Sequence, residues 1–138
     1  MLNRLKKNGK KGFTLVELIV VLIILAILAA LLVPALKGYI DKAQEKQIEA
    51  ETRQVVMAAQ TIVDEEYAKG ENTFTLDTTP TDFTKVKVAE LAELPSERID
   101  SITVSSGLVT KVVYKLSGKT CTYKKDSATD QAVFETTP

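Results

Sequence analysis

The stretch that decides the fold begins KKGFTLVE at residues 10–17 and continues through sixteen residues, 18–33, that carry no polar side chain. A helix rises about 1.5 Å per residue, so about 20 apolar residues are enough to cross the roughly 30 Å hydrocarbon core of a bilayer. Such a segment is not stable in water by itself. We therefore expect it to lie in lipid or in an equally apolar assembly of identical helices.

Glu17 is the one acidic residue next to this apolar run. A lone carboxylate in a membrane span costs about 2.5–3.5 kcal/mol at mid-membrane, and the nearest cations, Lys11 and Lys37, both lie outside the span. We therefore expect Glu17 to find a partner outside the apolar core of its helix. If the chain were cut after Gly12, the new amine on Phe13 would lie four residues from Glu17. That amine could pair with Glu17 of its own chain or of a neighbouring copy.

KKGFTLVE followed by an apolar helix resembles the class III signal of type IV pilins and pseudopilins. The resemblance implies that a prepilin peptidase on the cytoplasmic side cuts after Gly12 and N-methylates Phe13. It also implies that Glu17 supports the register of subunits in a filament. Pro34 falls where many family members carry a proline that kinks the helix. The resemblance covers residues 1–40 closely and the remainder only in architecture.

The charges are distributed unevenly between the start of the chain and the rest. Residues 1–12 carry five cations and no anion, which leaves thirteen cations against eighteen anions in the remainder of the 138-residue chain. A basic segment just before a span stays in the cytoplasm, so we expect the remainder to be delivered outside. The acidic balance of that remainder argues against nucleic acid as its partner.

An ordinary secretory signal also has a basic start and an apolar stretch. Here the apolar stretch is longer than in a typical signal. The two candidate small-x-small sites, at residues 28–30 and 33–35, both begin with a bulky residue. These features favour a prepilin signal, and an uncleaved signal anchor is the alternative.

Past the apolar run, the helical pattern continues with a changed surface. Pro34 removes one backbone hydrogen bond from a helix and Gly38 adds local freedom, so we expect a kink near these residues. Apolar residues then recur at the spacings of one helical face. They are Ile40, Ala43, Ile48, Val55, Ala59, Ile62 and Val63.

Lys69 and Gly70 are typical of a helix end, with a cation in the last turn and a glycine able to adopt the left-handed cap. The sequence therefore predicts four segments. They are a leader peptide at 1–12, a transmembrane and assembly half-helix at 13–36, an amphipathic half-helix at 37–69, and a globular head at 70–138.

The head is predicted to contain a connector, a short helix and a small sheet. We expect the helix at 86–94 and three strands at 99–104, 108–116 and 119–124, joined by short turns that favour an antiparallel meander. Residues from 126 onward are expected to form a tail that is polar except for Val133 and Phe134. The predicted fold class is α+β, with the amphipathic half of the long helix packed on the sheet. Five residues are expected to face that helix: Val112, Tyr114, Leu116, Cys121 and Tyr123.

The head offers little catalytic chemistry. The chain has no histidine, which removes the usual neutral-pH base and the commonest metal ligand. Asp126 and Asp130 are too few for a calcium site that needs six or more oxygens. Cys121 is the only cysteine and is interpreted as a small core residue. We expect no enzyme activity, no metal and no cofactor.

Many pilins of Gram-negative bacteria close their C-terminal loop with a disulfide, and a chain with a single cysteine departs from that pattern. It is more similar to pilins of Gram-positive bacteria. The resemblance implies a structural subunit of a type IV pilus, with prepilin peptidase, the assembly machinery, the cytoplasmic membrane and copies of itself as partners. Two alternatives stay open, a pseudopilin of a secretion or competence apparatus and a monomeric membrane-anchored binding module.

Overall fold

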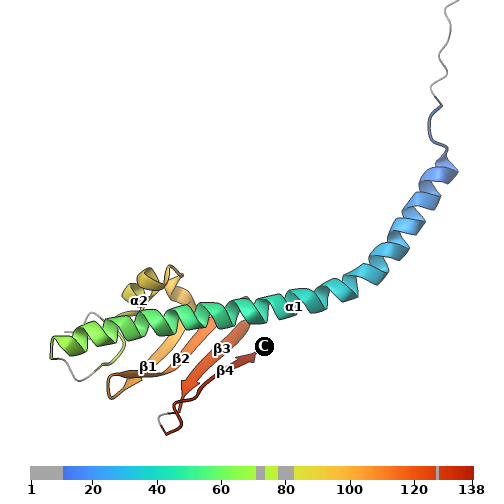
Figure 1. Cartoon of the computed structure of the whole chain (residues 1–138). Coiled ribbons are helices and arrows are strands. Elements are labelled where there is room, and N and C mark those ends of the chain that lie inside the picture. The colour runs from blue at the N-terminus through green and yellow to red at the C-terminus, as the bar shows by residue number, and fades with distance from the viewer. Residues whose placement is uncertain (1–10, 71–73, 78–82, 127) are drawn as a thin grey trace, which may run out of the picture. The chain divides into compact units, whose positions relative to one another are not determined.

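The computed structural model describes residues 11–70, 74–77, 83–126 and 128–138; residues 1–10 of the predicted leader lie outside them. The chain falls into two compact units that divide between Ile40 and Asp41. Figure 1 shows the elements in chain order. They are α1 (Leu15–Ala68), α2 (Lys85–Ala92), the 3-10 helix η1 (Ser96–Arg98), β1 (Ile99–Ser105), β2 (Leu108–Leu116), β3 (Lys119–Lys125) and β4 (Ala132–Thr137).

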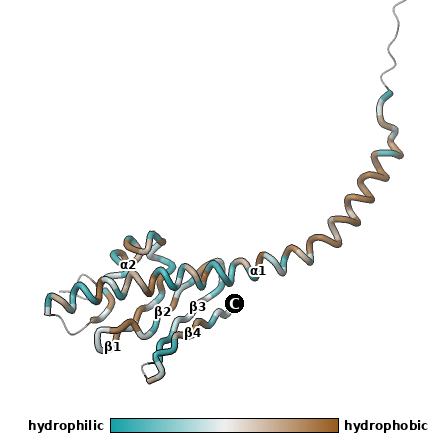
Figure 2. Tube along the Cα trace, viewed as in Figure 1, coloured by the Kyte–Doolittle hydropathy of each residue, from teal (hydrophilic) through white to brown (hydrophobic). Residues whose placement is uncertain are grey.

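The first part of α1 presents apolar side chains on all sides. Every side chain from residue 11 to residue 40 is exposed, and Figure 2 shows an almost unbroken hydrophobic run over the start of the helix. The helix passes through Pro34 and Gly38 without interruption. Neither residue ends the helix, and the kink stays a prediction. The observed end at Ala68 lies one residue before the expected stop at Lys69.

The second part of α1 buries one face. The predicted amphipathic face is confirmed from Ile48 onward, whereas Ile40 and Ala43 are exposed. Burying a large apolar side chain contributes about 1.5–3 kcal/mol, so this face holds the helix against the rest of the head. The buried residues are Ile48, Thr52, Val55, Ala58, Ala59, Ile62, Val63 and Glu66.

The short helix α2 is capped at both ends. The Thr84 hydroxyl accepts a hydrogen bond from the backbone N–H of Lys87 at 3.2 Å. Glu93 adopts the left-handed conformation, with φ 56°, and the next N–H, of Leu94, donates to the Ala89 carbonyl at 2.9 Å. Such caps satisfy backbone groups that a short helix leaves open. The helix expected at 86–94 is confirmed with slightly earlier bounds.

Within the described residues, four strands form one antiparallel sheet in the order β1-β2-β3-β4. The face expected to meet α1 is confirmed. Val112, Tyr114 and Cys121 are fully buried, and Tyr123 is 6% exposed. Leu116 is partly buried at the edge of the same core.

The prediction of three strands followed by a polar tail was wrong, because residues 132–137 form the fourth strand. β4 pairs with β3 from Lys125 opposite Ala132 to Thr120 opposite Thr137. The reversal before it is closed by the Asp126 N–H, which donates to the Gln131 carbonyl at 3.1 Å.

Phe134 anchors β4 to the rest of the head. Its ring lies 5.2 Å from the Tyr123 ring, centroid to centroid, and the Arg53 guanidinium of α1 lies 4.8 Å above it. Cys121 on the neighbouring strand is a free, buried cysteine. The C-terminal segment is therefore held by strand pairing and aromatic packing, without a disulfide.

Gln60 and Glu51 of α1 both form hydrogen bonds with the sheet. The Gln60 amide donates to the Gly107 carbonyl and accepts from the Val109 N–H, both at 2.9 Å, so one side chain holds the β1–β2 hairpin. The Tyr114 hydroxyl donates to Glu51 Oε2 at 2.6 Å. Burial, helped by this hydrogen bond to Glu51, raises the pKa of Tyr114 to about 12.

Candidate functional site

Thr14 and Glu17 form a reciprocal cap at the start of α1. The Thr14 hydroxyl accepts a hydrogen bond from the Glu17 N–H at 3.2 Å. Glu17 Oε2 in turn accepts from the Thr14 N–H at 2.9 Å. This is a capping box, in which a threonine and a glutamate three residues later satisfy two N–H groups that a helix start leaves without partners.

The cap changes the account of Glu17. Its hydrogen-bond partner in the structure is the Thr14 backbone N–H of the same chain, whereas the predicted partner was a Phe13 amine of its own chain or of a neighbouring copy. The carboxylate also lies at the helix N-terminus, where the helix dipole favours a negative charge. Within the part of the chain that the structure describes, Oε1 of Glu17 accepts no hydrogen bond. One carboxylate oxygen is thus open to a further donor.

Thr14 is a helix-capping residue that was not predicted from the sequence. The signal was present, because a threonine followed three residues later by a glutamate and then by an apolar run is the sequence pattern of a capping box. The prediction instead gave Glu17 a partner of opposite charge, the amine of Phe13.

Gly12 and Phe13 lie just before the helix, in backbone without regular structure. Phe13 is 84% exposed. A Cβ added at Gly12 would meet no atom within 4 Å. The bond between these two residues is therefore accessible, and nothing in the described chain itself requires a glycine at residue 12.

By length and composition, α1 could cross a membrane, and it is the one such helix among the described residues. The apolar window that qualifies it has no buried residue. Such a surface needs an apolar environment.

A family model described as the prokaryotic N-terminal methylation motif matches residues 7–33. The chain carries a class III signal. The match confirms the resemblance to the N-terminus of type IV pilins and pseudopilins. It takes in Gly12, Phe13, Glu17 and the apolar run, and it ends before Pro34. No curated protein and no solved structure matches the chain.

The class III signal and the apolar helix together fit a membrane-anchored precursor.

In the head, the described residues include no group of three histidine, cysteine, aspartate or glutamate side chains placed to hold a metal ion. Asp130 pairs with Lys125 at 2.8 Å, and Asp126 accepts from the Ala128 N–H at 2.9 Å. Asp126 and Asp130 thus both have partners within the chain.

Proposed function

We propose that this chain is the precursor of a structural subunit of a type IV pilus. Prepilin peptidase cuts it between Gly12 and Phe13 and methylates the new amine of Phe13. The leader faces the cytoplasm and the head lies outside. The assembly machinery then moves the subunit from the membrane into a helical filament whose core is formed by residues 18–33 of many copies.

One observation carries this proposal: the methylation motif at residues 7–33 runs into α1, whose side chains are all exposed as far as residue 40. That surface is stable in lipid before assembly and among identical helices afterwards. The apolar surface of α1 is therefore covered both before and after assembly.

Glu17 is proposed to act in assembly through its open carboxylate oxygen. In the mature chain, Phe13 carries a positive amine. The Phe13 amine of an adjacent subunit can donate to Oε1 of Glu17 while Oε2 keeps its bond to Thr14. The pair would offset the cost of bringing the carboxylate into an apolar filament core.

The intact mass of the native protein tests the pathway. We expect a chain that lacks residues 1–12 and carries one added methyl group. A native chain that still begins at residue 1 would contradict the proposal.

Gly12→Leu tests the cleavage site in the same measurement. Because a side chain at residue 12 meets nothing in this chain, any block belongs to the peptidase, and we expect an uncut precursor. Gly38→Leu is a matched control, since residue 38 also has open space around it, and it should give the mature N-terminus.

A pseudopilin would carry the same class III signal. The length and location of the assembled fibres distinguish a pilus subunit from a pseudopilin. We expect long surface fibres by electron microscopy when the subunit is abundant. Short assemblies confined to the envelope would favour a pseudopilin. A monomeric membrane-anchored binding module would give neither, and its subunits would not crosslink through residues 18–33.

A further inference from the structure

The face of the sheet turned away from α1 carries three lysines. Lys115 pairs with Asp100 at 2.6 Å and Lys124 with Glu135 at 3.2 Å, so the excess positive charge of this face comes from Lys111. Its lysines alternate along the strands with side chains buried against α1, such as Val112 and Tyr123. Val133, which is 53% exposed, stands opposite one of them across the β3–β4 ladder. We call this surface the basic sheet face. Its lysines are Lys111, Lys115 and Lys124.

Two of these lysines oppose each other directly. Lys111 on β2 is the register partner of Lys124 on β3, and like charges in that relation destabilise a sheet. Lys124 has Glu135 at 3.2 Å. Lys111 forms no ion pair with any residue that the structure describes. The head thus keeps an unfavourable, uncompensated charge on its surface, which favours an anionic partner outside the head.

An acidic groove lies where α2 runs beside α1. Met57 and Leu91 are 62% and 53% exposed there. The groove consists of two hollows, of about 350 and 370 Å³, that share Leu91. Lys87 also lines the second hollow. Three carboxylates line the groove and form no ion pair within the described chain: Glu65, Glu90 and Glu93.

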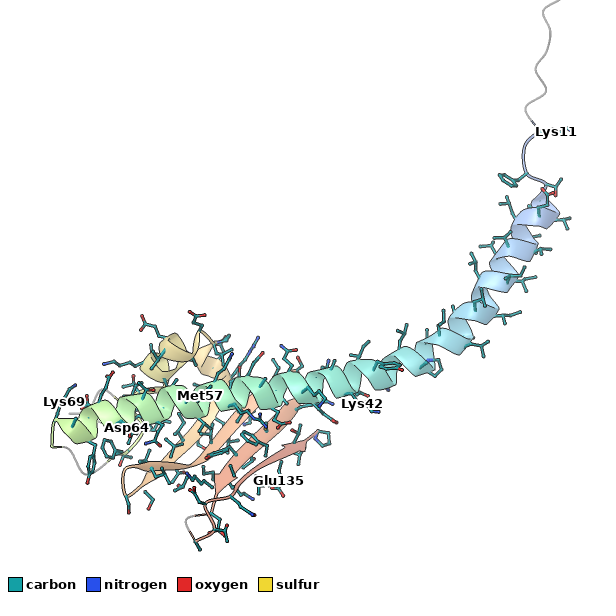
Figure 3. All side chains as sticks on the ribbon, in the orientation of Figure 1. Lys11, Lys42, Met57, Asp64, Lys69 and Glu135 are labelled. Atoms are coloured by element: carbon teal, nitrogen blue, oxygen red, sulfur yellow. The ribbon has the colours of Figure 1, made fainter. Side chains whose placement is uncertain are left out.

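The two surfaces lie on opposite sides of the head. Figure 1 shows α2 on one side of α1 and the strands on the other. Figure 3 marks Met57 on α1 and Glu135 among the side chains of the sheet. The basic sheet face and the acidic groove therefore cannot meet within one head. Both combine apolar side chains with charges of opposite sign, which suits one to the other.

We propose that the basic sheet face of one head docks in the acidic groove of the next copy. A contact between two different faces is heterologous, and repeating it produces an open helical polymer unless the rotation closes a ring. Lys111 supplies its uncompensated charge to Glu90 and its neighbours, and Val133 faces the exposed Met57 and Leu91. This inference rests on the proposed function, because it describes head contacts within that filament.

Charge reversal in the full chain, expressed with its assembly machinery, tests the contact. Lys111→Glu and Glu90→Lys are made singly and together, and sheared surface filament is measured against total subunit. We expect each single variant to lower the assembled fraction roughly fivefold, which corresponds to about 1 kcal/mol at 1.4 kcal/mol per tenfold. The double variant should regain most of the assembled fraction.

The thermal midpoint of Lys111→Glu shows whether a loss of assembly comes from unfolding of the head or from loss of the contact. Lys111→Glu places an acid opposite Lys124, so the thermal midpoint of the head should stay the same or rise. Glu97→Lys, on η1 and outside both surfaces, is the matched control and should assemble normally.

The outcomes separate this contact from the proposed function. Normal assembly of Lys111→Glu, or a double variant as poor as the singles, would overturn the contact while leaving the pilus subunit intact. A wild-type chain that is cut and methylated but never forms filaments would remove the proposed function and this contact with it.

Discussion

Glu17 has one role in the capping box and a second, proposed role in filament assembly, and substitutions can separate the two. Its length and its oxygen serve the helix start through Thr14. Its charge serves the proposed pair with the amine of an adjacent Phe13. An alanine at residue 17 would remove both, so its effect on filaments would not identify which one matters.

Glu17→Gln isolates the charge, because a glutamine can still accept from the Thr14 N–H in a capping box. We expect normal membrane insertion and normal cleavage, with markedly less filament. Intact mass and sheared-filament yield are the two measurements. Wild-type filament yield from this variant would argue against the proposed role of the charge.

Thr14→Ala isolates the cap, because the Glu17 charge remains. Losing an N-cap hydroxyl costs about 1 kcal/mol, so amide exchange at Glu17 should accelerate roughly fivefold. Hydrogen exchange of the full chain in lipid nanodiscs measures this. Thr14→Ser keeps the hydroxyl and should exchange like the wild type; equal rates in all three chains would mean that the cap contributes nothing.

Tyr114 predicts how the stability of the head depends on alkaline pH. Its folded pKa is about 12, above the ordinary value of about 10. The unfolded side chain therefore loses its proton first. The stabilisation is complete below pH 10 and is lost as pH rises toward 12, by up to roughly 2–3 kcal/mol.

Urea unfolding of the full chain in detergent, followed by circular dichroism between pH 8 and pH 12, checks this. Tyr114→Phe should be less stable at pH 8, because Glu51 loses the Tyr114 hydroxyl and keeps only the donors of Gln47 and Arg98, yet it should show a weaker decline above pH 10. A decline equal to that of the wild type would assign the alkaline effect to other groups.

At the scale of elements, β4 is what completes the head. Its side chains are exposed except for Phe134 and Thr136, which are half-buried. Phe134 contacts both the Tyr123 ring and the Arg53 guanidinium. The strand therefore joins α1 to the end of the sheet through one aromatic ring.

Phe134→Ala should lower the free energy of unfolding of the head by about 2 kcal/mol, from lost burial and the lost cation–π contact. Val133→Ala, at the adjacent and more exposed position, is the control and should cost less than about 1 kcal/mol. Thermal unfolding monitored by circular dichroism compares them. Equal losses would contradict the anchoring role of Phe134.

The sequence predicted most of this fold because its periodicities are strong. The apolar run, the helical face from Ile48 onward and the alternation around Tyr114 each left a clear pattern. β4 left only two apolar residues, Val133 and Phe134, among residues that resemble the polar turn before it, and its pairing depends on β3. The residues proposed for cleavage and assembly came from one short motif. Thr14 was missed because its role is a local hydrogen bond. The hydrogen bonds of Gln60 and Glu51 to the sheet could not be predicted, because they join residues far apart in the chain.

At the scale of the whole molecule, the apolar residues 18–33 need apolar surroundings, whereas the head buries its apolar side chains in its own core. Every described side chain up to residue 40 is exposed, whereas the head has a buried core of its own. A change in the segment should therefore alter where the chain resides without altering how the head folds.

Ile24→Lys tests this separation, since a charge at the middle of a span costs about 2.5–3.5 kcal/mol. We expect less carbonate-resistant protein in membranes and almost no filament, with an unchanged thermal midpoint for the head. Leu36→Lys is the control, because a lysine near the end of a span reaches the interface. Membrane retention of Ile24→Lys equal to that of the wild type would contradict an apolar environment for residues 18–33.

The free thiol of Cys121, enclosed between β2 and β4, has a consequence for where the subunit can mature. Because no disulfide has to form, folding of the head requires neither an oxidant nor a disulfide isomerase. The same chain should mature equally well with oxygen or without it.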